Sequence, residues 1–429
     1  MKDIAGAIIL AAGDGKRMKS HKSKVCCEVL FKPMLSWVID ACEAAGILAE
    51  NICVVISDTE NGVLDLLPPK INTAVQKDKL GTGHAVLMAR GFLESLNSKG
   101  IKQVAVLNGD APLISSDDLL KALELNTKKN ADLTVISAIL SQGYNYGRII
   151  RKNGRIEKIR EKKNCSAQEL EINEVNSGAY WFDTKFVLDN IEKIKSNDLT
   201  GEYYLTDLVE IAALHNNGCE GYICEDKNAV LGANDRSELN VLNEIARDMV
   251  LAKLYNDGVS IPIRDGVIIS PDAKIGEDTL ILPGTIIKGK TTIGRENTIG
   301  ANSCISNSYI GNGNVIEQTK ISDSTVGDGC KIGPFTQLRP NSKIGNYVKI
   351  GNFVEVKNSS VGEKTSLAHL TYIGDSDFGR HINVGCGVVT VNYNGVGKFR
   401  TTVEDDAFIG CNSNLIAPVR VKKGAYVAA

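Results

Sequence analysis

The chain has 429 residues, too many for one ordinary hydrophobic core, and fits two domains or one domain and a repeat array. Its 49 Lys and Arg nearly balance its 51 Asp and Glu, so the composition offers no broad basic face for a nucleic-acid backbone. The 11 cysteines include no C-x-x-C pair, which favours neither a zinc cluster nor a disulfide framework and fits a reducing cytoplasm. No apolar run approaches the roughly 20 residues of a membrane span. We therefore expect a cytoplasmic protein with no nucleic-acid or membrane partner.

The first half of the chain, to about residue 234, alternates short apolar runs with amphipathic stretches. The clearest of these segments cover residues 7–10, 34–44, 52–56, 83–93 and 104–107. This rhythm is typical of βαβ units and predicts a mostly parallel sheet with helices on both faces, an α/β Rossmann-like domain. Ligands bind such sheets beyond the carboxyl ends of the strands, so the loops after Leu10 and Leu107 are the first candidates for a site.

Residues 235–258 place apolar side chains at helical spacing, with Asp235 or Ser237 as N-cap and Gly258 as a stop. We interpret them as a linker helix between a domain at residues 1–234 and a second domain at residues 259–429.

In the second domain aliphatic residues recur at every sixth position, often followed by glycine. The series comprises Ile275, Ile281, Ile287, Ile293, Ile299 and Ile305, and later Ile332, Leu338, Ile344, Ile350 and Val356. A period of six predicts a hexapeptide β-helix with three flat sides, here left-handed, whose aliphatic residues fill a narrow core. The phase breaks between Thr390 and Val403, which predicts a loop. The sequence reaches residues 427–429 in mid-coil, so we expect this domain to be incomplete at its C-terminus.

Residues 8–18 predict a buried strand followed by a glycine-rich turn. Gly13 and Gly15 would let backbone N–H groups face an anion, and Arg17 could offer a forked donor to a phosphate. The pattern is neither G-x-G-x-x-G nor a Walker motif. From the pattern alone, a tight turn and a phosphate cradle are equally good interpretations.

A set of motifs in the first half resembles the sugar-nucleotide pyrophosphorylases. L-A-A-G-x-G-x-R-M at residues 10–18 is followed by Lys24, although Ser23 replaces the proline that the family has before this lysine. Further matches, in order, are Gln76 with LGTGHA (80–85), NGDAP (108–112), YGRI (146–149), Glu161, EVNSG (174–178), GEYYLTD (201–207) and GANDR (232–236). As a set they resemble the uridylyltransferase half of the bacterial bifunctional N-acetylglucosamine-1-phosphate uridylyltransferase and glucosamine-1-phosphate acetyltransferase family.

The resemblance implies a Mg²⁺ site and a role for each matching residue. Asp110 and Asn234 would hold the metal. In the alternative, purely structural interpretation, Asp110 caps a helix and Asn234 starts a turn. Arg17 and Lys24 would be catalytic and neutralise the phosphates of UTP. UTP and its uracil would contact Leu10, Ala11, Ala12, Gly13, Gln76, Gly81 and Thr82. N-acetylglucosamine would contact Gly147, Glu161, Asn176 and Ser177.

Segments 339–357, 369–375, 382–387 and 391–399 resemble the acetyltransferase half of the same family. A base must take a proton as the sugar amine attacks the acetyl thioester, and a histidine suits this work. The resemblance gives this role to His369, with Glu355 as an orienting carboxylate and Asn392 as a support. The other implied substrate-binding residues are Arg339, Lys357, Tyr372, Asn383, Tyr393 and Lys398, and the acetyl-coenzyme A path would include Cys386, Cys411 and Ala429.

The resemblance thus implies a homotrimeric enzyme that acetylates glucosamine-1-phosphate with acetyl-coenzyme A and then transfers a uridylyl group from UTP. One alternative is a uridylyltransferase whose truncated acetyltransferase domain is inactive. Two others are a nucleotidyltransferase of different specificity on a structural β-helix and a noncatalytic nucleotide sensor. Gln76 with LGTGHA and His369 with its cluster favour the bifunctional enzyme over a nucleotidyltransferase of different specificity. A sensor is disfavoured by the presence of Arg17, Lys24, Asp110 and Asn234.

Overall fold

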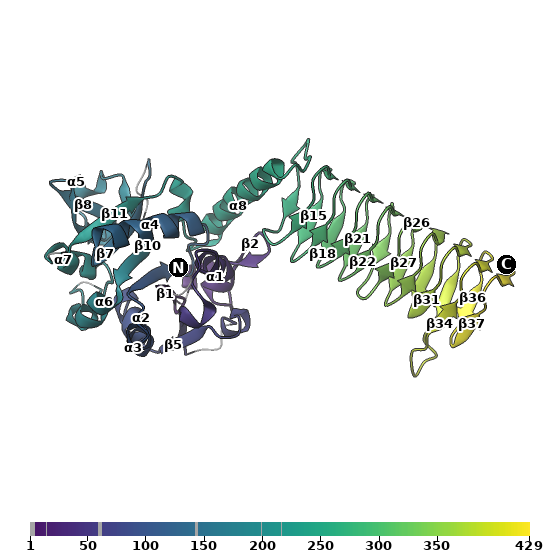
Figure 1. Cartoon of the computed structure of the whole chain (residues 1–429), viewed down its shortest axis with the longest axis horizontal. Helices are drawn as coiled ribbons and strands as arrows, with labels where there is room; N and C mark the ends of the chain where they lie inside the picture. Colours follow the sequence, from purple (N-terminus) through teal and green to yellow (C-terminus); the bar gives the residue numbers. More distant parts are fainter. Residues whose placement is uncertain (1–4, 14, 59–61, 142–144, 199, 216) are drawn as a thin grey trace. The chain divides into compact units, whose positions relative to one another are not determined.

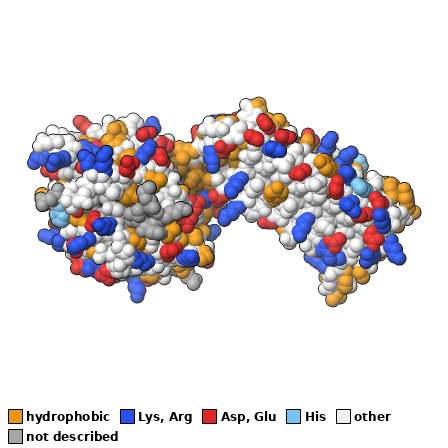
Figure 2. Space-filling view, viewed as in Figure 1, with side chains coloured by type: hydrophobic (Ala, Val, Ile, Leu, Met, Phe, Trp, Pro, Cys, Tyr) orange, Lys and Arg blue, Asp and Glu red, His pale blue; other side chains and the backbone are white. Residues whose placement is uncertain are grey.

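The computed structural model of the protein describes residues 5–13, 15–58, 62–141, 145–198, 200–215 and 217–429 (Figure 1). The chain forms two compact units, Met1–Ala246 and Arg247–Ala429. On the face of each unit drawn in Figure 2, basic and acidic side chains are interspersed. Within the described ranges, no helix has both the length and the apolarity needed to cross a bilayer.

A nine-stranded sheet forms the centre of the described part of the first unit. Its main path runs through β11 (Cys219–Ile223), β7 (Leu133–Ile139), β10 (Glu174–Asp183), β6 (Gln103–Asn108), β1 (Ala5–Leu10), β4 (Ile52–Ser57) and β5 (Asn72–Gln76). The hairpin of β8 (Arg148–Lys152) and β9 (Arg155–Arg160) joins through β10. The pairs along the main path are parallel except those of β10, which is antiparallel to both β6 and β7. The predicted α/β domain is confirmed, with a mixed sheet.

Helices cover both faces of this sheet because successive strand residues point to opposite sides. Ile8 packs with α2 (Thr82–Met88), α3 (Arg90–Ser98), α6 (Thr184–Asn190) and α7 (Asp207–Ala213). Its neighbour Ile9 packs with α1 (Met34–Ala44) and α4 (Ser116–Lys129) on the other face. The single amphipathic stretch expected at residues 83–93 is two helices, because the backbone leaves the helical conformation at Ala89 (ψ 12°).

The helix expected after residue 234 is α8 (Arg236–Asn256), and the boundary between the two units falls inside it. Asp235 caps it: the Oδ1 atom accepts from the backbone N–H groups of Ser237 and Glu238, both at 2.9 Å. Gly258, with φ 82°, lies two residues beyond its end.

The second unit is a left-handed β-helix with three parallel sheets, each of nine short strands in the described residues, from β12 (Ile268–Ile269) to β38 (Tyr426–Val427). All the aliphatic residues of the period-six series are buried in one continuous core. This confirms the predicted repeat. Between β33 (Val389–Val391) and β34 (Thr401–Val403) the chain leaves the coil in a loop, as the break in phase predicts. Figure 1 shows this loop projecting from the coils near the yellow end of the β-helix.

Candidate active sites

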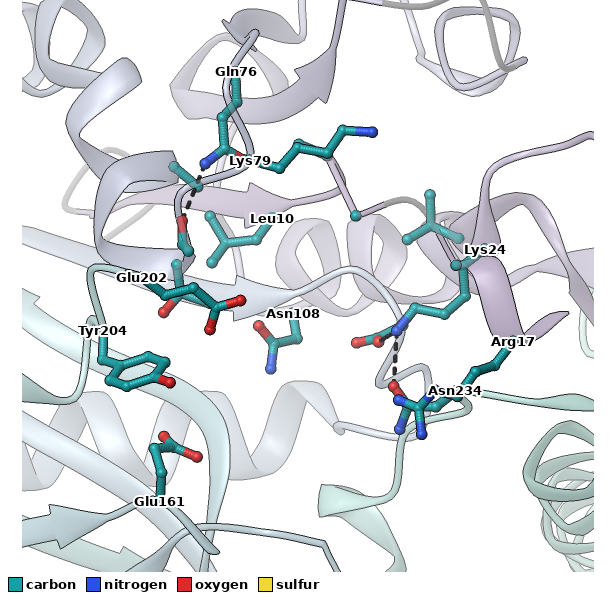
Figure 3. A pocket seen from close by; sticks show the side chains of 18 residues that line it. Leu10, Arg17, Lys24, Gln76, Lys79, Asn108, Glu161, Glu202, Tyr204 and Asn234 are labelled. Carbon is teal, nitrogen blue, oxygen red and sulfur yellow. Dashed lines mark hydrogen bonds and ion pairs between the residues drawn. The ribbon is translucent and has the colours of Figure 1, made fainter. Parts of the chain in front are cut away.

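The carboxyl ends of β1, β5 and β6 meet at one edge of the first unit's sheet and border a cavity of about 660 Å³. The last residue of each strand, Leu10, Gln76 and Asn108, lines this cavity. Of the residues expected from sequence, the lining includes Leu10, Ala12, Gly13, Arg17, Lys24, Gln76, Gly81, Thr82, Asp110, Glu161 and Asn234. The edge of the sheet therefore gathers the residues assigned to uracil, phosphates and metal (Figure 3).

Gln76 is held at one end of the cavity by two polar contacts. Its side chain is buried, and its Nε2 atom donates to the backbone carbonyl of Gly81 at 3.0 Å and lies 3.0 Å from Nδ1 of His84. His84 is thus in direct contact with Gln76. Gly81 has φ 100°, and a Cβ there would lie 2.6 Å from the carbonyl oxygen of Tyr203. Only glycine fits this close approach.

A cationic side chain lies between the two residues expected to bind metal. Lys24 Nζ forms an ion pair with the Asp110 carboxylate and donates to Asn234 Oδ1 at 3.1 Å. The side chains of Lys24 and Asp110 are only 15% and 21% exposed. Figure 3 shows Arg17 on the same side of the cavity, next to Asn234. Asp110 and Asn234, 124 positions apart in sequence, therefore present their oxygens to one positive charge.

The residue that replaces the expected proline keeps a proline-like backbone. Ser23 has φ −53° and ψ 146°, within the range that a proline ring imposes. Its buried hydroxyl has no hydrogen-bond partner among the described residues. The loop before Lys24 is thus compatible with the family's usual sequence.

The residues expected to hold the sugar do not all line this cavity. Burial raises the pKa of the Glu161 carboxyl above its ordinary value, and the Thr206 hydroxyl donates to it at 3.5 Å. Asn176 is buried in β10: its Nδ2 donates to the hydroxyl of Tyr180 at 2.7 Å, and its backbone N–H donates to the carbonyl of Gly147 at 2.9 Å. Glu161 alone of the sugar set lines the first cavity.

Ser177 faces an adjoining cavity of about 590 Å³, which shares Asn108, Asp110 and Asn234 with the first. The register of β10 against β7 shifts between Asn176 and Ala179, and such a bulge re-aims side chains. Ala11 is buried, and its N–H donates to the carbonyl of Val55 at 2.8 Å, so it supports the loop from within the sheet.

Of the lining residues that have no role in the sequence-based assignment, four are polar or charged: Lys79, Asn108, Glu202 and Tyr204. Asn108 ends β6 directly before Gly109 and Asp110, and its place at a strand end is a signal that could have found it. Glu202 and Tyr204 belong to the GEYYLTD segment, which comes next to the uracil end because the N–H of Leu205 donates to the Thr82 hydroxyl at 3.0 Å. For Lys79 we find no signal in the sequence.

One side of the β-helix gathers most of the polar residues assigned to the second activity. Arg339 Nη1 donates to Glu355 Oε1 at 2.7 Å, and Tyr372 in β30 (Tyr372–Gly374) pairs in register with Glu355 in β27 (Glu355–Lys357). The nearby charges of Lys398 and Arg339 lower the pKa of Lys357. The clustered positive charges make this side of the β-helix suited to bind an anion.

The loop at residues 392–399 is anchored beside this cluster. The Asn392 side chain donates to the Asp375 carboxylate, and Tyr393 donates from its hydroxyl to the carbonyl of Gly395 at 2.7 Å. Burial opposes the charged form of Asp375, but hydrogen bonds from Asn358 and Asn392, together with the charges of Lys398 and Lys357, lower the pKa of this carboxyl.

His369 ends β29 (Ser366–His369), at the corner before the strand that carries Tyr372. The expectation that Glu355 orients His369 stays a prediction; the Oε1 atom of Glu355 accepts from Arg339. The Nδ2 group of Asn392 donates to Asp375, and its support of His369 likewise stays a prediction. Asn383, in β32 (Asn383–Val384), belongs to the same sheet as His369 and not to the Arg339 cluster. Cys386 follows that strand, and the exposed Cys411 lies one coil further on.

Two family models match the chain, one for each unit. A nucleotidyl transferase model matches residues 6–227, and a bacterial transferase hexapeptide model of six repeats matches residues 272–307 and 323–358. The chain therefore joins a nucleotidyltransferase to a hexapeptide-repeat transferase. The bifunctional proteins GlmU of Acetivibrio thermocellus, Clostridium novyi and Caldanaerobacter subterraneus are 40%, 42% and 43% identical to it. The matches cover 99% of this chain and 91%, 92% and 91% of those proteins.

The chain belongs to the family of the bifunctional proteins GlmU. It is an enzyme with a uridylyltransferase and an acetyltransferase activity, and its substrates include a nucleotide and acetyl-coenzyme A. The alternative of uridylyl transfer alone is not favoured, since the relatives match along both units.

Proposed function

We propose that the chain makes UDP-N-acetylglucosamine in two steps. The β-helix transfers the acetyl group of acetyl-coenzyme A to the amine of glucosamine-1-phosphate. The first unit then transfers the uridylyl group of UTP to N-acetylglucosamine-1-phosphate and releases pyrophosphate. The observation that carries this proposal is the shared cavity, in which Gln76, Glu161 and the group of Lys24, Asp110 and Asn234 all lie.

A divalent cation fits beside Asp110 and Asn234. The contacts of Lys24 with both residues support this, because its ammonium shows that the two oxygen atoms can hold one positive charge between them. Mg²⁺ is commonly bound by one or two protein oxygens with substrate phosphates and water completing the shell. The described residues contain no group of three or more His, Cys, Asp or Glu side chains suited to a metal, so all-protein coordination is not part of this proposal. When bound, Mg²⁺ supplies positive charge against the triphosphate and the leaving pyrophosphate.

The chain's own residues then position the reacting groups. Arg17 and Lys24 neutralise phosphate charge, and Lys24 moves from Asp110 to the triphosphate as the substrates bind. A phosphate oxygen of the sugar ester attacks the α-phosphorus of UTP, and the bond from that phosphorus to the bridging oxygen of the pyrophosphate breaks. No covalent enzyme intermediate is needed, since transfer of this kind depends on positioning and charge neutralisation.

Specificity comes from the two ends of the cavity. At one end, the Gln76 amide, Thr82 and the backbone near Leu10, Ala12 and Gly81 read uracil, with Ala11 and Gly13 completing the turn. At the other end, Glu161 accepts hydrogen bonds from sugar hydroxyls. Beyond it Gly147, Asn176 and Ser177 shape the subsite for the acetamido group, and Ser177 lines the adjoining cavity.

In the second unit we assign the base to His369. It takes a proton from the sugar nitrogen as that nitrogen attacks the acetyl carbonyl, and coenzyme A leaves as a thiol. The phosphate binds the basic side, which consists of Arg339, Lys357, Tyr372 and Lys398. Asn383 contacts the sugar, Asn392 and Tyr393 form the loop that borders it, and Cys386, Cys411 and Ala429 border the coenzyme A path.

We also propose that the enzyme works in the cytoplasm, where UTP and acetyl-coenzyme A are made, as a homotrimer with acetyl-transfer sites between β-helices. A row of exposed apolar side chains on one corner supports such a contact: Phe335, Phe353 and Leu370 are 54%, 57% and 59% exposed, and the two phenyl rings stack at 5.4 Å. Light scattering after size-exclusion chromatography tests the subunit number, and a monomeric mass would contradict the trimer.

The test of the first activity is product mass after incubation with UTP, Mg²⁺ and each sugar phosphate. Asp110→Asn should lower pyrophosphate release by at least about 100-fold, because it removes the charge that fixes the cation. Asp117→Asn, which removes an exposed carboxylate on α4, should leave the rate within about twofold. Turnover of Asp110→Asn at the rate of the Asp117→Asn control would refute the metal assignment.

The second activity is tested by transfer of acetyl from acetyl-coenzyme A to glucosamine-1-phosphate. His369→Ala should lower it by roughly 100-fold or more, because no base remains at that corner, while pyrophosphate release stays unchanged. His381→Ala, an exposed histidine of the same β-helix that faces Asp406, is the matched control and should keep both rates. Equal losses of both activities in His369→Ala would argue against separate sites.

A further inference from the structure

Cys386 and Cys411 occupy the same corner position on neighbouring coils of the β-helix. Two residues earlier, Val384 and Ile409 pair in register in β32 and β35 (Phe408–Ile409). The backbone N–H of Asn412 donates to the carbonyl of Cys386 at 2.8 Å. Each cysteine is therefore the direct neighbour of the other along the axis of the β-helix.

The residue after each cysteine has a positive φ, so the two cysteines stand at the same point of similar turns. Cys386 precedes Gly387 (φ 75°), and Cys411 precedes Asn412 (φ 54°). Adjacent strands lie about 4.8 Å apart. This spacing falls within the Cα separation of about 4.4–6.8 Å that disulfides span, but it exceeds their mean Cβ separation of about 3.8 Å. A bond between the two sulfurs would need a small local approach of the two turns, and slightly strained, exposed disulfides are readily reduced.

Access to solvent separates these two thiols from the buried cysteines of the chain. Cys411 is exposed and Cys386 is partly exposed, and all eleven cysteines are free. Burial raises the pKa of Cys42, Cys53 and Cys224 to about 12, which leaves little reactive thiolate there.

The next position along the same corner, on the other side of Cys386, is His369. The N–H of Gly387 donates to the His369 carbonyl at 3.4 Å, in the same pattern that joins Asn412 to Cys386. A covalent link between the two sulfurs would thus form one coil away from the imidazole to which we assign acetyl transfer.

We propose that Cys386 and Cys411 form a redox-modification site: a low-molecular-weight disulfide such as glutathione disulfide oxidises them to an intrachain disulfide, which blocks acetyl transfer and leaves uridylyl transfer intact. The effect on acetyl transfer rests on the proposed function of the His369 corner. The formation of the disulfide does not.

The chemistry balances without any further reagent. The Cys411 thiolate attacks one sulfur of glutathione disulfide, and one glutathione thiolate leaves. The Cys386 thiolate then attacks the Cys411 sulfur of the mixed disulfide and expels the second glutathione. Two protein thiols are oxidised, one external disulfide is reduced to two thiols, and a dithiol reductant reverses both exchanges.

The experiment uses the full chain, first reduced and freed of reductant, then incubated with glutathione disulfide, alkylated and digested for peptide mass analysis. We expect a linked pair of peptides that carry Cys386 and Cys411. Acetyl transfer should fall by at least about tenfold relative to the same protein's reduced rate and return with dithiothreitol, while uridylyl transfer changes by less than about twofold.

Two variants make the result specific, each compared with its own reduced rate. Cys411→Ser should keep its acetyl transfer through the oxidation. Cys304→Ser, which removes a partly buried cysteine elsewhere on the β-helix, should lose acetyl transfer as the unmodified chain does.

Failure to find the linked peptides, or an equal oxidative loss in Cys411→Ser, would overturn the inference. A disulfide between Cys386 and Cys411 that left acetyl transfer unchanged would overturn the proposed block of acetyl transfer. A reduced enzyme without acetyl transfer would instead overturn the proposed function of the β-helix, and the peptide masses would still decide whether the dithiol is oxidised.

Discussion

Replacing Lys24 by methionine tests whether its ammonium occupies the cation position of the first unit. Lys24 forms an ion pair with Asp110 and donates to Asn234 Oδ1 at 3.1 Å. A metal ion that binds these two oxygen ligands must first displace the ammonium. In Lys24→Met this competitor is gone, and a positive charge next to the metal is removed as well. Metal binding in the absence of nucleotide should therefore become tighter.

The expected gain follows from the burial of the ion pair. Exposed ion pairs contribute about 0–1 kcal/mol, whereas loss of one partner from a fully buried pair costs about 3–5 kcal/mol. The side chains of Lys24 and Asp110, 15% and 21% exposed, lie between these limits. We take about 1.5–3 kcal/mol, which corresponds to roughly a 10- to 150-fold lower Kd for the metal.

The assay is titration of nucleotide-free protein with Mn²⁺, with the free ion measured by electron paramagnetic resonance. Lys121→Met is the matched control, because it removes an exposed lysine that pairs with Asp117 and should leave the Kd unchanged. Turnover of Lys24→Met with UTP should fall, since the triphosphate loses a cation. An unchanged or weaker affinity for Mn²⁺ would refute the idea that Lys24 competes with the metal.

Two further predictions concern the stability of the first unit, which contains both tryptophans of the chain, Trp37 and Trp181, so that urea unfolding followed by fluorescence reports on this unit. Ser23→Pro should stabilise it by about 0.4–1 kcal/mol, because the native φ of −53° already suits proline and the unfolded chain loses freedom; an unchanged or lower urea midpoint would contradict this. Burial raises the pKa of Asp207 from 3.8 to about 6, because the folded state favours the neutral carboxyl. The folded state therefore keeps its full stability below about pH 4, where Asp207 is neutral, and loses stability as the pH rises through 6 and the buried carboxyl ionises. Asp207→Asn should therefore gain on the order of 1 kcal/mol relative to the native chain between pH 5 and pH 7.5, a figure reduced for solvent screening, and a difference independent of pH would contradict it.

The β-helix could be predicted from sequence because its interactions are local and periodic. Ile275, Ile281 and Ile287 each fill the same environment six positions apart, so spacing alone identified the buried residues. The fold of the first unit was harder to predict from sequence. The antiparallel direction of β10 depends on the β8–β9 hairpin that precedes it, and an alternation of strands and helices predicts only parallel neighbours.

In the candidate sites, too, local features could be predicted from sequence and contacts between distant residues could not. Sequence places Leu10 and Asp110 near strand ends, but no local pattern brings Asn234 to Asp110, and this convergence came from the resemblance. The pairing of Lys24 with both was not foreseen, because it depends on a contact across 210 positions. The contacts of Glu355 with Arg339 and of Asn392 with Asp375 were not foreseen for a related reason, because the partners of a polar side chain are decided by its neighbours on adjacent coils.

The two units assemble polar groups by opposite means, which explains where each is sensitive to change. In the first unit the distance between Gln76 and Asn234 is set by the whole sheet, and any change that moves a strand end alters the cavity. In the β-helix the distance between neighbours at a corner is the strand spacing of about 4.8 Å, repeated by the backbone itself. The chemistry at a corner is therefore decided almost entirely by which residue stands there. Serine at position 411 would leave the coil unchanged and remove the possibility of a dithiol, so a single side chain decides whether this corner can respond to oxidation.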